Sequence, residues 1–137
     1  MAEPAPGFQK HPNYQVDIIP TEDHVRILLG EHCVADSRRP LMVTETKHHP
    51  VWYLPLEDVN ADFIAATEHS TFCPFKGHAS YWTVSVGDQV LPDSLWAYQD
   101  PYIECEPLKD HVGFYVDRFA LEVNGERQND PGPGWCE

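Results

Sequence analysis

Apolar residues recur with a period of two in residues 25–29 and again in residues 119–123. The first stretch ends at Gly30, and the second is followed by Asn124 and Gly125. Alternation that stops at such a turn is typical of half-buried strands joined in hairpins. We therefore predict a strand in each of these stretches.

Five further stretches are rich in β-branched and aromatic residues, which favour strands. They are residues 41–46, 51–54, 79–86, 95–98 and 112–116. A helical pattern occurs only in residues 60–67, which contain several alanines and a short apolar face, with Asp58 or Asn60 as the N-cap. The pattern as a whole predicts an all-β protein with one short helix.

A strand–turn–strand pattern occurs twice along the chain. In each copy a glycine, Gly30 or Gly87, is followed six residues later by an Asp-Ser pair that begins at Asp36 or Asp93. Chance explains this repeat as well as a duplication does, because Gly-acid turns are common in β proteins. A true repeat predicts two similar sheets packed over one core.

The length of 137 residues fits one domain. Both ends are rich in residues that disfavour regular structure. We predict an extended N-terminal arm at residues 1–15, a single β domain at residues 16–125 and an extended tail at residues 126–137. Trp135 in the tail is expected to dock back on the domain rather than to serve an oligomer contact.

Hydrophobic residues make up 42% of the chain, which is too many for a disordered protein. The chain has 9 Lys and Arg and 22 Asp and Glu residues, so its formal net charge is −13. So acidic a domain is repelled by nucleic acids and anionic membranes, so we expect neither as a partner. No apolar run approaches the roughly 20 residues that cross a bilayer, and residues 1–7 do not resemble a secretory signal. We predict a cytoplasmic protein, and the Pro-rich arms leave a homodimer as an open alternative.

The cysteines lie at positions 33, 73, 105 and 136 and form no Cys-x-x-Cys pair. Without a signal peptide, reduced thiols are a simpler expectation than disulfide bonds. The eight histidines include no His-x-x-x-His pair of the kind that helical zinc sites use. We predict no metal and no cofactor, although a metal site assembled from separate strands stays an open alternative.

The stretch Thr71–Ala79 combines a thiol, an ammonium group, an imidazole and two aromatic rings, and its composition predicts a loop. Gly77 permits a tight turn next to Lys76. A lysine on such a turn clamps an anionic ligand, or acts as acid, base or imine former when desolvation lowers its pKa. The alternative is an ordinary solvated lysine on a surface loop. Cys73 lies in the same stretch.

Glu45 is a second candidate because of its place in the predicted strand 41–46. A period of two puts Glu45 on the same face as Leu41 and Val43, the expected core face. A carboxylate there must be paired, protonated or open to a cavity, and Lys76 is one suitable partner. Alternatively, the strand frays at Glu45 and the side chain points to water.

Several other side chains are candidates for a ligand site. Tyr53 shares a strand face with Val51 and offers a phenol to a pocket wall. Large aromatic residues line pockets or fill cores, and core packing is the commoner role. Arg39 either binds a carboxylate or phosphate of a ligand or pairs with one of the many acidic residues.

Several motifs of the chain, in order, resemble one known family. They are Ala35-Asp36-Ser37, Glu45, Pro50-Val51-Trp52-Tyr53-Leu54-Pro55, Asp58-Val59, Thr71-x-Cys73-Pro74-Phe75-Lys76-Gly77-x-Ala79-x-Tyr81-Trp82, Trp96-x-Tyr98 and Val112-x-Phe114-Tyr115. The family is filed as domain of unknown function 427, and the resemblance covers residues 16–125.

The resemblance implies a β-tent (Mss4-like) fold, in which two antiparallel sheets meet at an angle. Many β-tent proteins hold zinc through Cys-x-x-Cys motifs, which this sequence lacks. The family is sometimes labelled nucleotidyltransferase-like, but the Gly-Ser and spaced Asp pair that would hold nucleotide and magnesium are missing here. The resemblance also implies that Glu45 and Lys76 line a shared pocket. The residues that match recurrent family positions are Glu45, Tyr53, Cys73, Lys76, Trp82, Trp96 and Tyr98.

Two functional hypotheses follow. The first is a cofactor-independent enzyme with isomerase, cyclase or hydratase-like acid–base chemistry on a small anionic or carbonyl-containing molecule, with Lys76, Glu45 and Tyr53 as catalytic residues. The second is a non-catalytic module that binds a small molecule or peptide, with Glu45 and Lys76 as a structural ion pair. The predicted ligand-binding residues are Arg39, Cys73, Trp82, Trp96 and Tyr98.

Overall fold

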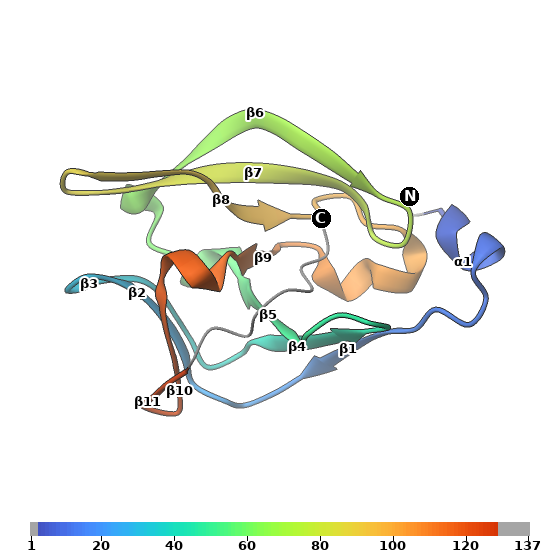
Figure 1. Cartoon of the computed structure of the whole chain (residues 1–137), viewed down its shortest axis with the longest axis horizontal. Coiled ribbons are helices and arrows are strands. Elements are labelled where there is room, and N and C mark those ends of the chain that lie inside the picture. Colours follow the sequence, from blue (N-terminus) through green and yellow to red (C-terminus); the bar gives the residue numbers. More distant parts are fainter. Residues whose placement is uncertain (1–2, 129–137) are drawn as a thin grey trace.

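Antiparallel strands dominate the fold (Figure 1). The structure, a computed structural model, describes residues 3–128. The strands form a seven-stranded and a four-stranded sheet, and all neighbours pair antiparallel. The prediction of an all-β protein with two antiparallel sheets is therefore confirmed, whereas the β-tent arrangement stays a prediction.

The large sheet runs from edge to edge through β1 (Val16–Pro20), β4 (Leu41–Glu45), β5 (Val51–Pro55), β9 (His111–Phe114), β8 (Gln89–Ala97), β7 (Gly77–Val86) and β6 (Ile64–Cys73). The small sheet runs through β11 (Glu126–Arg127), β10 (Ala120–Val123), β2 (Val25–Leu29) and β3 (His32–Ser37). The helical segments are α1 (Pro6–Lys10) and the 3-10 turns η1 (Leu56–Asp58), η2 (Ala61–Phe63), η3 (Ile103–Leu108) and η4 (Val116–Arg118).

Each of the seven stretches predicted as a strand from its residue pattern contains one. The largest difference in their boundaries is in β8, which begins at Gln89 rather than at Leu95. The repeated strand–turn–strand pattern forms two hairpins, β2–β3 in the small sheet and β7–β8 in the large sheet. Gly30 and Gly87 turn these hairpins with φ of 62° and 58°, a region that glycine adopts without steric cost.

The helix predicted for residues 60–67 is wrong. The Asn60 side chain accepts a hydrogen bond from the Asp62 backbone N–H, but it caps only the 3-10 turn η2. From Ile64 onward the chain pairs with β7 as the edge strand β6, with Ala65 and Ala66 exposed. Pairing along a ten-residue neighbour outweighs the helix propensity of a few alanines, because propensity is a weak preference.

The arm predicted to be extended over residues 1–15 contains the short helix α1, so that expectation is wrong for Pro6–Lys10. Pro6 fits this place because a helix tolerates proline in its first turn. At the other end of the chain, β11 is part of the predicted tail, and Trp135 lies outside the described residues. No helix within residues 3–128 combines the length and apolar character that a membrane span requires.

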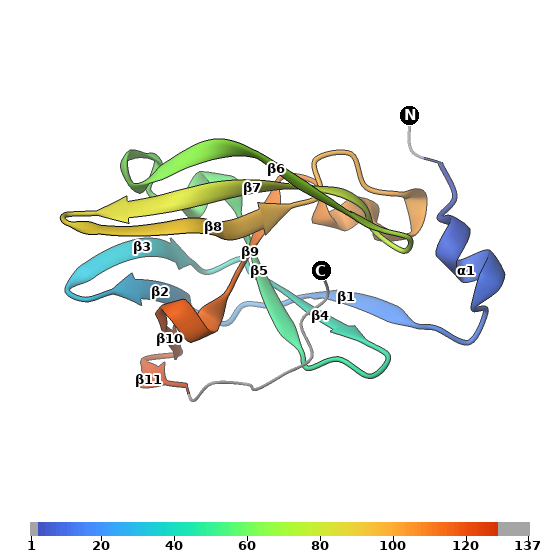
Figure 2. The ribbon, with the colours of Figure 1, turned by 45° about the horizontal axis from the view of Figure 1, so that its top comes forward.

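The middle strands of the large sheet are buried on both faces because the sheet bends. One face packs on the small sheet, and the β2–β3 hairpin lies beneath β7 and β8 (Figure 2). In Figure 1, β6 to β8 run along the top and β1 and β4 along the bottom, with the orange segment that contains η3 between them. The other face is therefore buried inside the bend, against η3.

Alternation along single strands divides the side chains between two apolar clusters. In β8, Leu95 belongs to the cluster between the sheets, and Trp96 belongs to the cluster inside the bend. In β5, Leu54 and Tyr53 are divided in the same way. This period of two is the one that the sequence shows, and it determines which side chains meet inside the bend.

Gly113 in β9 makes room for the Trp96 ring. A Cβ atom at this position would lie 2.5 Å from the ring, far inside van der Waals contact. Close packing of this kind requires glycine whatever its backbone angles are.

We predict that Gly113→Ala lowers the free energy of unfolding by about 1–3 kcal/mol, because the added methyl group overpacks a rigid ring. Urea denaturation of the full chain measures this change. Ser85→Ala, at an exposed position of β7, is the control and should change stability by less than about 0.5 kcal/mol. Equal stability of the two variants would contradict the close packing of Gly113 on Trp96.

Candidate functional site

Glu45 and Lys76 form a buried ion pair inside the bend of the large sheet. The Lys76 Nζ atom donates to Glu45 Oε1 at 2.5 Å. The Lys76 side chain is 0% exposed and the Glu45 side chain 3% exposed, so water does not reach the ammonium group. The two residues implied to share a pocket are thus brought together, but in direct contact with each other.

Glu45 and Lys76 come from segments that lie far apart in the strand order of the sheet. Glu45 is the last residue of β4, and it follows the buried residues of the same face, Leu41 and Val43. Lys76 is the last residue of the turn between β6 and β7. This turn is shorter than the loop predicted for Thr71–Ala79. Four strands separate β4 from β6 in the sheet order, so the pair closes the bend.

Gly77 fixes the direction of the turn beside Lys76. Its φ is 121°, which side-chain-bearing residues rarely adopt, and a Cβ atom there would lie 3.4 Å from the Asp100 carbonyl oxygen. The expectation that glycine permits a tight turn at this place is confirmed.

Polar and aromatic groups surround the ion pair. The Tyr14 hydroxyl donates a hydrogen bond to Glu45 Oε2, and the Tyr98 ring centroid lies 6.0 Å from Lys76 Nζ. Burial raises the pKa of the Cys105 thiol to about 12, although the nearby Lys76 charge acts in the opposite direction. The pair is therefore enclosed by groups that satisfy or tolerate its charges.

Most of the other predicted site residues belong to the same buried cluster. The Trp96 indole N–H donates to the Tyr53 hydroxyl at 2.9 Å, and the two rings meet edge to face. Tyr53, Trp96, Tyr98 and Cys73 are each at most 3% exposed. Of the two roles left open for the aromatic residues, the structure shows core packing.

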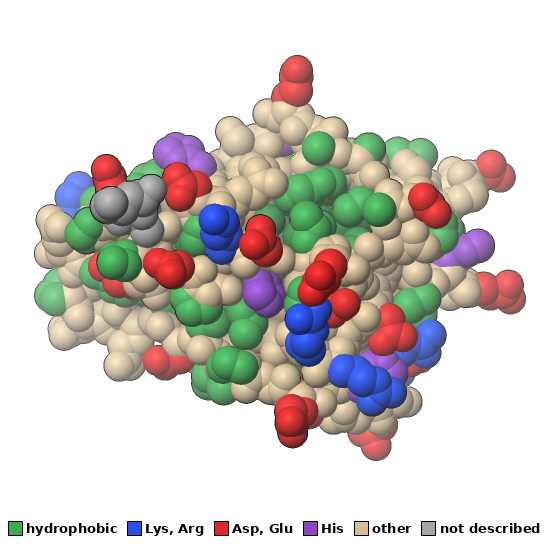
Figure 3. Space-filling view, turned by 180° about the vertical axis from the view of Figure 1, so that it is seen from behind, with side chains coloured by type: hydrophobic (Ala, Val, Ile, Leu, Met, Phe, Trp, Pro, Cys, Tyr) green, Lys and Arg blue, Asp and Glu red, His purple; other side chains and the backbone are tan. Residues whose placement is uncertain are grey.

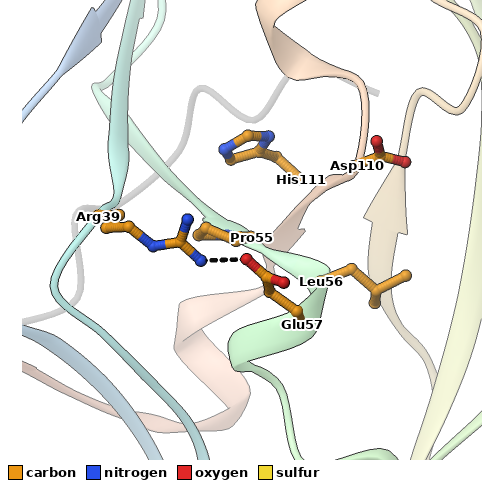
Figure 4. Close-up of a pocket in the computed structure, with 6 residues that line it drawn as sticks. All are labelled: Arg39, Pro55, Leu56, Glu57, Asp110 and His111. Carbon is orange, nitrogen blue, oxygen red and sulfur yellow. Dashed lines mark hydrogen bonds and ion pairs between the residues drawn. The ribbon is translucent and has the colours of Figure 1, made fainter.

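Trp82 and Arg39 lie apart from this cluster. Trp82 packs on the opposite face of the large sheet, in the cluster between the two sheets. Arg39 is ion-paired with Glu57, with Asp58 3.7 Å away. Figure 4 shows the Arg39 side chain reaching Glu57 at the edge of a cavity of about 500 Å³ that His111 also lines. Of its two predicted roles, Arg39 thus shows pairing with acidic residues of the chain.

A cleft of about 650 Å³ lies next to the ion pair. It is lined by Lys10, His11, Pro12, Asn13, Tyr14, Thr46, Lys47 and Phe75. Tyr14 and Phe75 stack face to face, with ring centroids 3.9 Å apart and an interplanar angle of 11°. Tyr14 lines the cleft and its hydroxyl donates to Glu45, so this ring links the cleft to the buried charges.

Among residues 3–128, no three His, Cys, Asp or Glu side chains are grouped in a way that could hold a metal ion. Cys33, Cys73 and Cys105 form no disulfide bond in this part of the chain, and Cys136 lies outside it. The side chains around Glu45 and Lys76 offer acid, base and aromatic chemistry.

The resemblance that the motifs indicate agrees with a comparison to known families. A family model described as a domain of unknown function (DUF427) matches residues 17–125. The chain belongs to this family. A search of curated proteins finds no match to the chain. Membership in DUF427 names no reaction, so the function must be argued from the site.

Sequence reasoning missed the contribution of the N-terminal arm to this DUF427 site. Phe8 and Tyr14 pack on Phe75, and Tyr14 also bonds Glu45. The available signal was the presence of two aromatic residues in an arm otherwise rich in turn-forming residues, because large rings rarely stay in water.

We predict that Lys76→Met alone lowers the free energy of unfolding by about 3–5 kcal/mol, because it leaves the Glu45 carboxylate buried without its partner. The double variant Glu45→Gln with Lys76→Met should recover much of that loss, since it removes both charges. Urea denaturation of the wild type, both single variants and the double variant measures the coupling.

The exposed pair Arg39–Glu57 is the matched control for this cycle, because its side chains are 63% and 70% exposed. Its coupling should stay below about 1 kcal/mol. Equal coupling in the two cycles would contradict the burial of Lys76.

We also predict that the Cys105 thiol resists alkylation in the native state. A pKa near 12 means that thiolate is scarce at pH 8, and burial blocks the reagent as well. Iodoacetamide labelling followed by peptide mass spectrometry should show Cys33, which is half-buried, reacting much faster than Cys105. Equal labelling of Cys33 and Cys105 in the folded protein would contradict this account.

Proposed function

We propose that this DUF427 protein binds a small anionic molecule in the cleft between the N-terminal arm and the turn that follows β4. The carrying observation is the charge of the cleft. Its lining holds Lys10, Lys47 and His11 and no acidic side chain. In a chain with more than twice as many acidic as basic residues, such a lining is unusual.

The contrast with the rest of the surface supports an anionic ligand. Figure 3 shows acidic side chains scattered over one face of the molecule, with some Lys and Arg side chains among them. The resulting negative field repels anions except where basic groups concentrate, so a local cluster of positive charge selects where an anion binds. The volume of about 650 Å³ fits a small organic molecule rather than a folded partner.

The aromatic side chains that line the cleft indicate a second property of the ligand, a planar shape. Phe75 and Tyr14 line the cleft as a stacked pair, and the Phe8 ring packs edge-on against Phe75 at 5.0 Å. Aromatic side chains form the apolar surfaces on which planar ligands pack. A planar anion, such as an aromatic carboxylate or phosphate ester, therefore fits the cleft best.

The backbone at Lys47 supports a role in binding. Lys47 has φ of 64°, in the left-handed region that costs a residue with a side chain energy. Strained residues of this kind occur often at ligand sites, where the surrounding structure holds them in place. In this proposal the turn after Glu45 orients Lys47, and the ion pair below anchors that turn.

Acid–base catalysis on the same ligand is a second candidate, and one observation favours it. Tyr14 lines the cleft and its hydroxyl also bonds Glu45, which in turn bonds Lys76. This chain of hydrogen bonds connects a cleft residue to the buried pair. An isomerase, cyclase or hydratase would need such a connection to move a proton between the pair and its ligand. In this candidate the arm must move for Glu45 to reach the ligand, and Tyr53 stays behind in the core.

We predict that phenyl phosphate and benzoate bind in the cleft and that neutral benzamide does not. Titrations of the 15N-labelled full chain should shift the amide signals of residues 10, 11, 13, 14, 46 and 47, since Pro12 has no amide proton. Removing one basic group with Lys10→Gln or Lys47→Asn should weaken phenyl phosphate binding about fivefold, because each exposed ion pair contributes up to about 1 kcal/mol. Asparagine at position 47 keeps the left-handed backbone accessible.

Lys109→Gln is the matched control, because it removes one positive charge from an exposed residue that does not line the cleft. It should leave phenyl phosphate affinity unchanged. Equal weakening of phenyl phosphate binding by all three variants would show that only the net charge of the protein matters. Binding of benzamide as tight as that of benzoate would show that the cleft does not select an anion.

A further inference from the structure

Two strands of the large sheet bulge at the same place, on either side of β7. Between Ala66 and Ser70, three residues of β6 lie opposite one residue of β7. Between Leu91 and Leu95, three residues of β8 lie opposite Thr83. Bulges redirect side chains and interrupt pairing, and they are enriched next to active sites. Two bulges on either side of one strand indicate a local arrangement of side chains that regular strand pairing would not allow.

Side chains from the two bulges meet across the intervening strand. Thr67 Oγ1 donates to Asp93 Oδ1 at 2.7 Å, although β7 lies between their strands. The Asp93 backbone N–H also donates to Thr83 Oγ1 at 3.3 Å. Asp93 has φ of 49°, so its backbone is held in a left-handed conformation that is uncommon outside glycine. Specific hydrogen bonds thus maintain the bulge of β8 despite its strain.

A cavity of about 340 Å³ lies beside these bulges. His69 and Asp93 reach it from the bulges themselves, and Thr71 and Tyr81 reach it from β6 and β7. The Thr71 and Tyr81 hydroxyls are 2.9 Å apart and hydrogen-bonded, and the His69 ring packs 4.4 Å from the Tyr81 ring. One side of the cavity is therefore an ordered set of hydroxyl, imidazole and phenol groups.

The segment after β9 forms the other side, with Tyr115, Asp117 and Arg118. The Arg118 Nη1 atom donates to the Pro92 carbonyl at 3.0 Å and to Ser94 Oγ at 3.1 Å. Its guanidinium carbon lies 4.8 Å from the Tyr115 ring centroid. Arg118 thus fastens η4 to the bulge of β8 and fixes the shape of the cavity.

This cavity connects to the predicted site through one aromatic contact. The Tyr115 ring lies 4.7 Å from the Trp96 ring, whose indole N–H bonds Tyr53. Trp96, predicted from the sequence as a ligand contact, therefore lies directly behind the Tyr115 wall rather than in a cavity of its own. This place is distinct from the basic cleft, whose lining it does not share.

We infer that this cavity binds a small neutral polyhydroxylated ring, of the size of a monosaccharide. Two carboxylates face one guanidinium here, so the lining disfavours an anion. Carboxylates accept hydrogen bonds from several ligand hydroxyls, and the Thr71–Tyr81 pair both donates and accepts them. The half-buried Tyr115 ring, which lines the cavity, supplies apolar surface for the C–H face of a sugar-like ring. In this assignment Asp93 and Asp117 orient the ligand hydroxyls.

The test is an NMR titration of the full 15N-labelled chain with glucose, ribose and myo-inositol, up to about 50 mM because single weak sites of this size bind in the millimolar range. We expect amide shifts confined to residues 67–71, 93–95 and 115–118. Asp117→Asn should weaken binding about tenfold or more, because it removes a charged acceptor. Asp117 is exposed and makes no ion pair with another described residue, so this variant should fold.

Asp93→Asn is the second variant, because asparagine also tolerates the left-handed backbone. Glu68→Gln, an exposed neighbour on β6 outside the lining, is the matched control and should leave affinity unchanged. Lys47→Asn in the basic cleft should also have no effect, which separates this site from the proposed anion site. Maltose is titrated alongside, since a free sugar and the end of a glycan share the same chemistry.

Two results would overturn the inference. One is the absence of shifts in the cavity residues with every polyol and with maltose, while the protein is folded. The other is binding of butylamine at these residues without any polyol binding, which would assign the carboxylates to a cation. Binding of the monosaccharides or of maltose that weakens in Asp117→Asn supports the assignment and identifies the source.

Discussion

One buried contact between opposite charges, Glu45 and Lys76, constrains the bend of the large sheet. Glu45 ends β4 near one edge of the large sheet, and Lys76 follows β6 at the other edge, so their contact at 2.5 Å holds a seven-stranded sheet in its bent form. Neither charge is tolerable alone in this interior, because desolvation of an unpaired ion costs several kcal/mol. The bend that brings them together also creates the second apolar cluster, with Trp96 and Tyr53 at its centre.

The same contact determines which surfaces remain available to a ligand. Because the pair is closed to water, the chemistry of Glu45 and Lys76 is separated from solvent by Tyr14 and Phe75. What stays open lies on either side of the buried cluster, as the basic cleft next to Phe75 and the bulge cavity next to Tyr115. The two openings differ in the charge of their linings, so the two proposals concern ligands of different chemistry.

The sequence predicts much of the fold because alternation is a local signal. The period of two in residues 25–29 and 41–46 places strands and even their buried faces, and it puts Glu45 on the core side correctly. It fails for β6, where Ala65 and Ala66 favour a helix but the chain pairs with a long neighbour. Such pairing depends on residues that are distant along the chain, and no local pattern reports it.

The candidate site is predictable in part for the same reason. Motifs and strand faces identify Glu45 and Lys76, but whether they border a cavity or contact each other depends on the curvature of the whole sheet. The packing of Tyr14 over the pair depends on the path of the arm, which its Pro-rich sequence does not specify. The bulges at Thr67 and Asp93 arise from pairing mismatches between strands, and these are invisible before the strands are paired.

Competitive acetylation of the folded chain tests the central claim most directly. The chain has four lysines, at positions 10, 47, 76 and 109. With limiting acetic anhydride and peptide mass spectrometry, the three others should be modified while Lys76 stays unmodified until the protein is denatured. Modification of Lys76 in the native protein at the rate of Lys109 would show that the ammonium group is open to solvent, and the buried pair would no longer explain the fold.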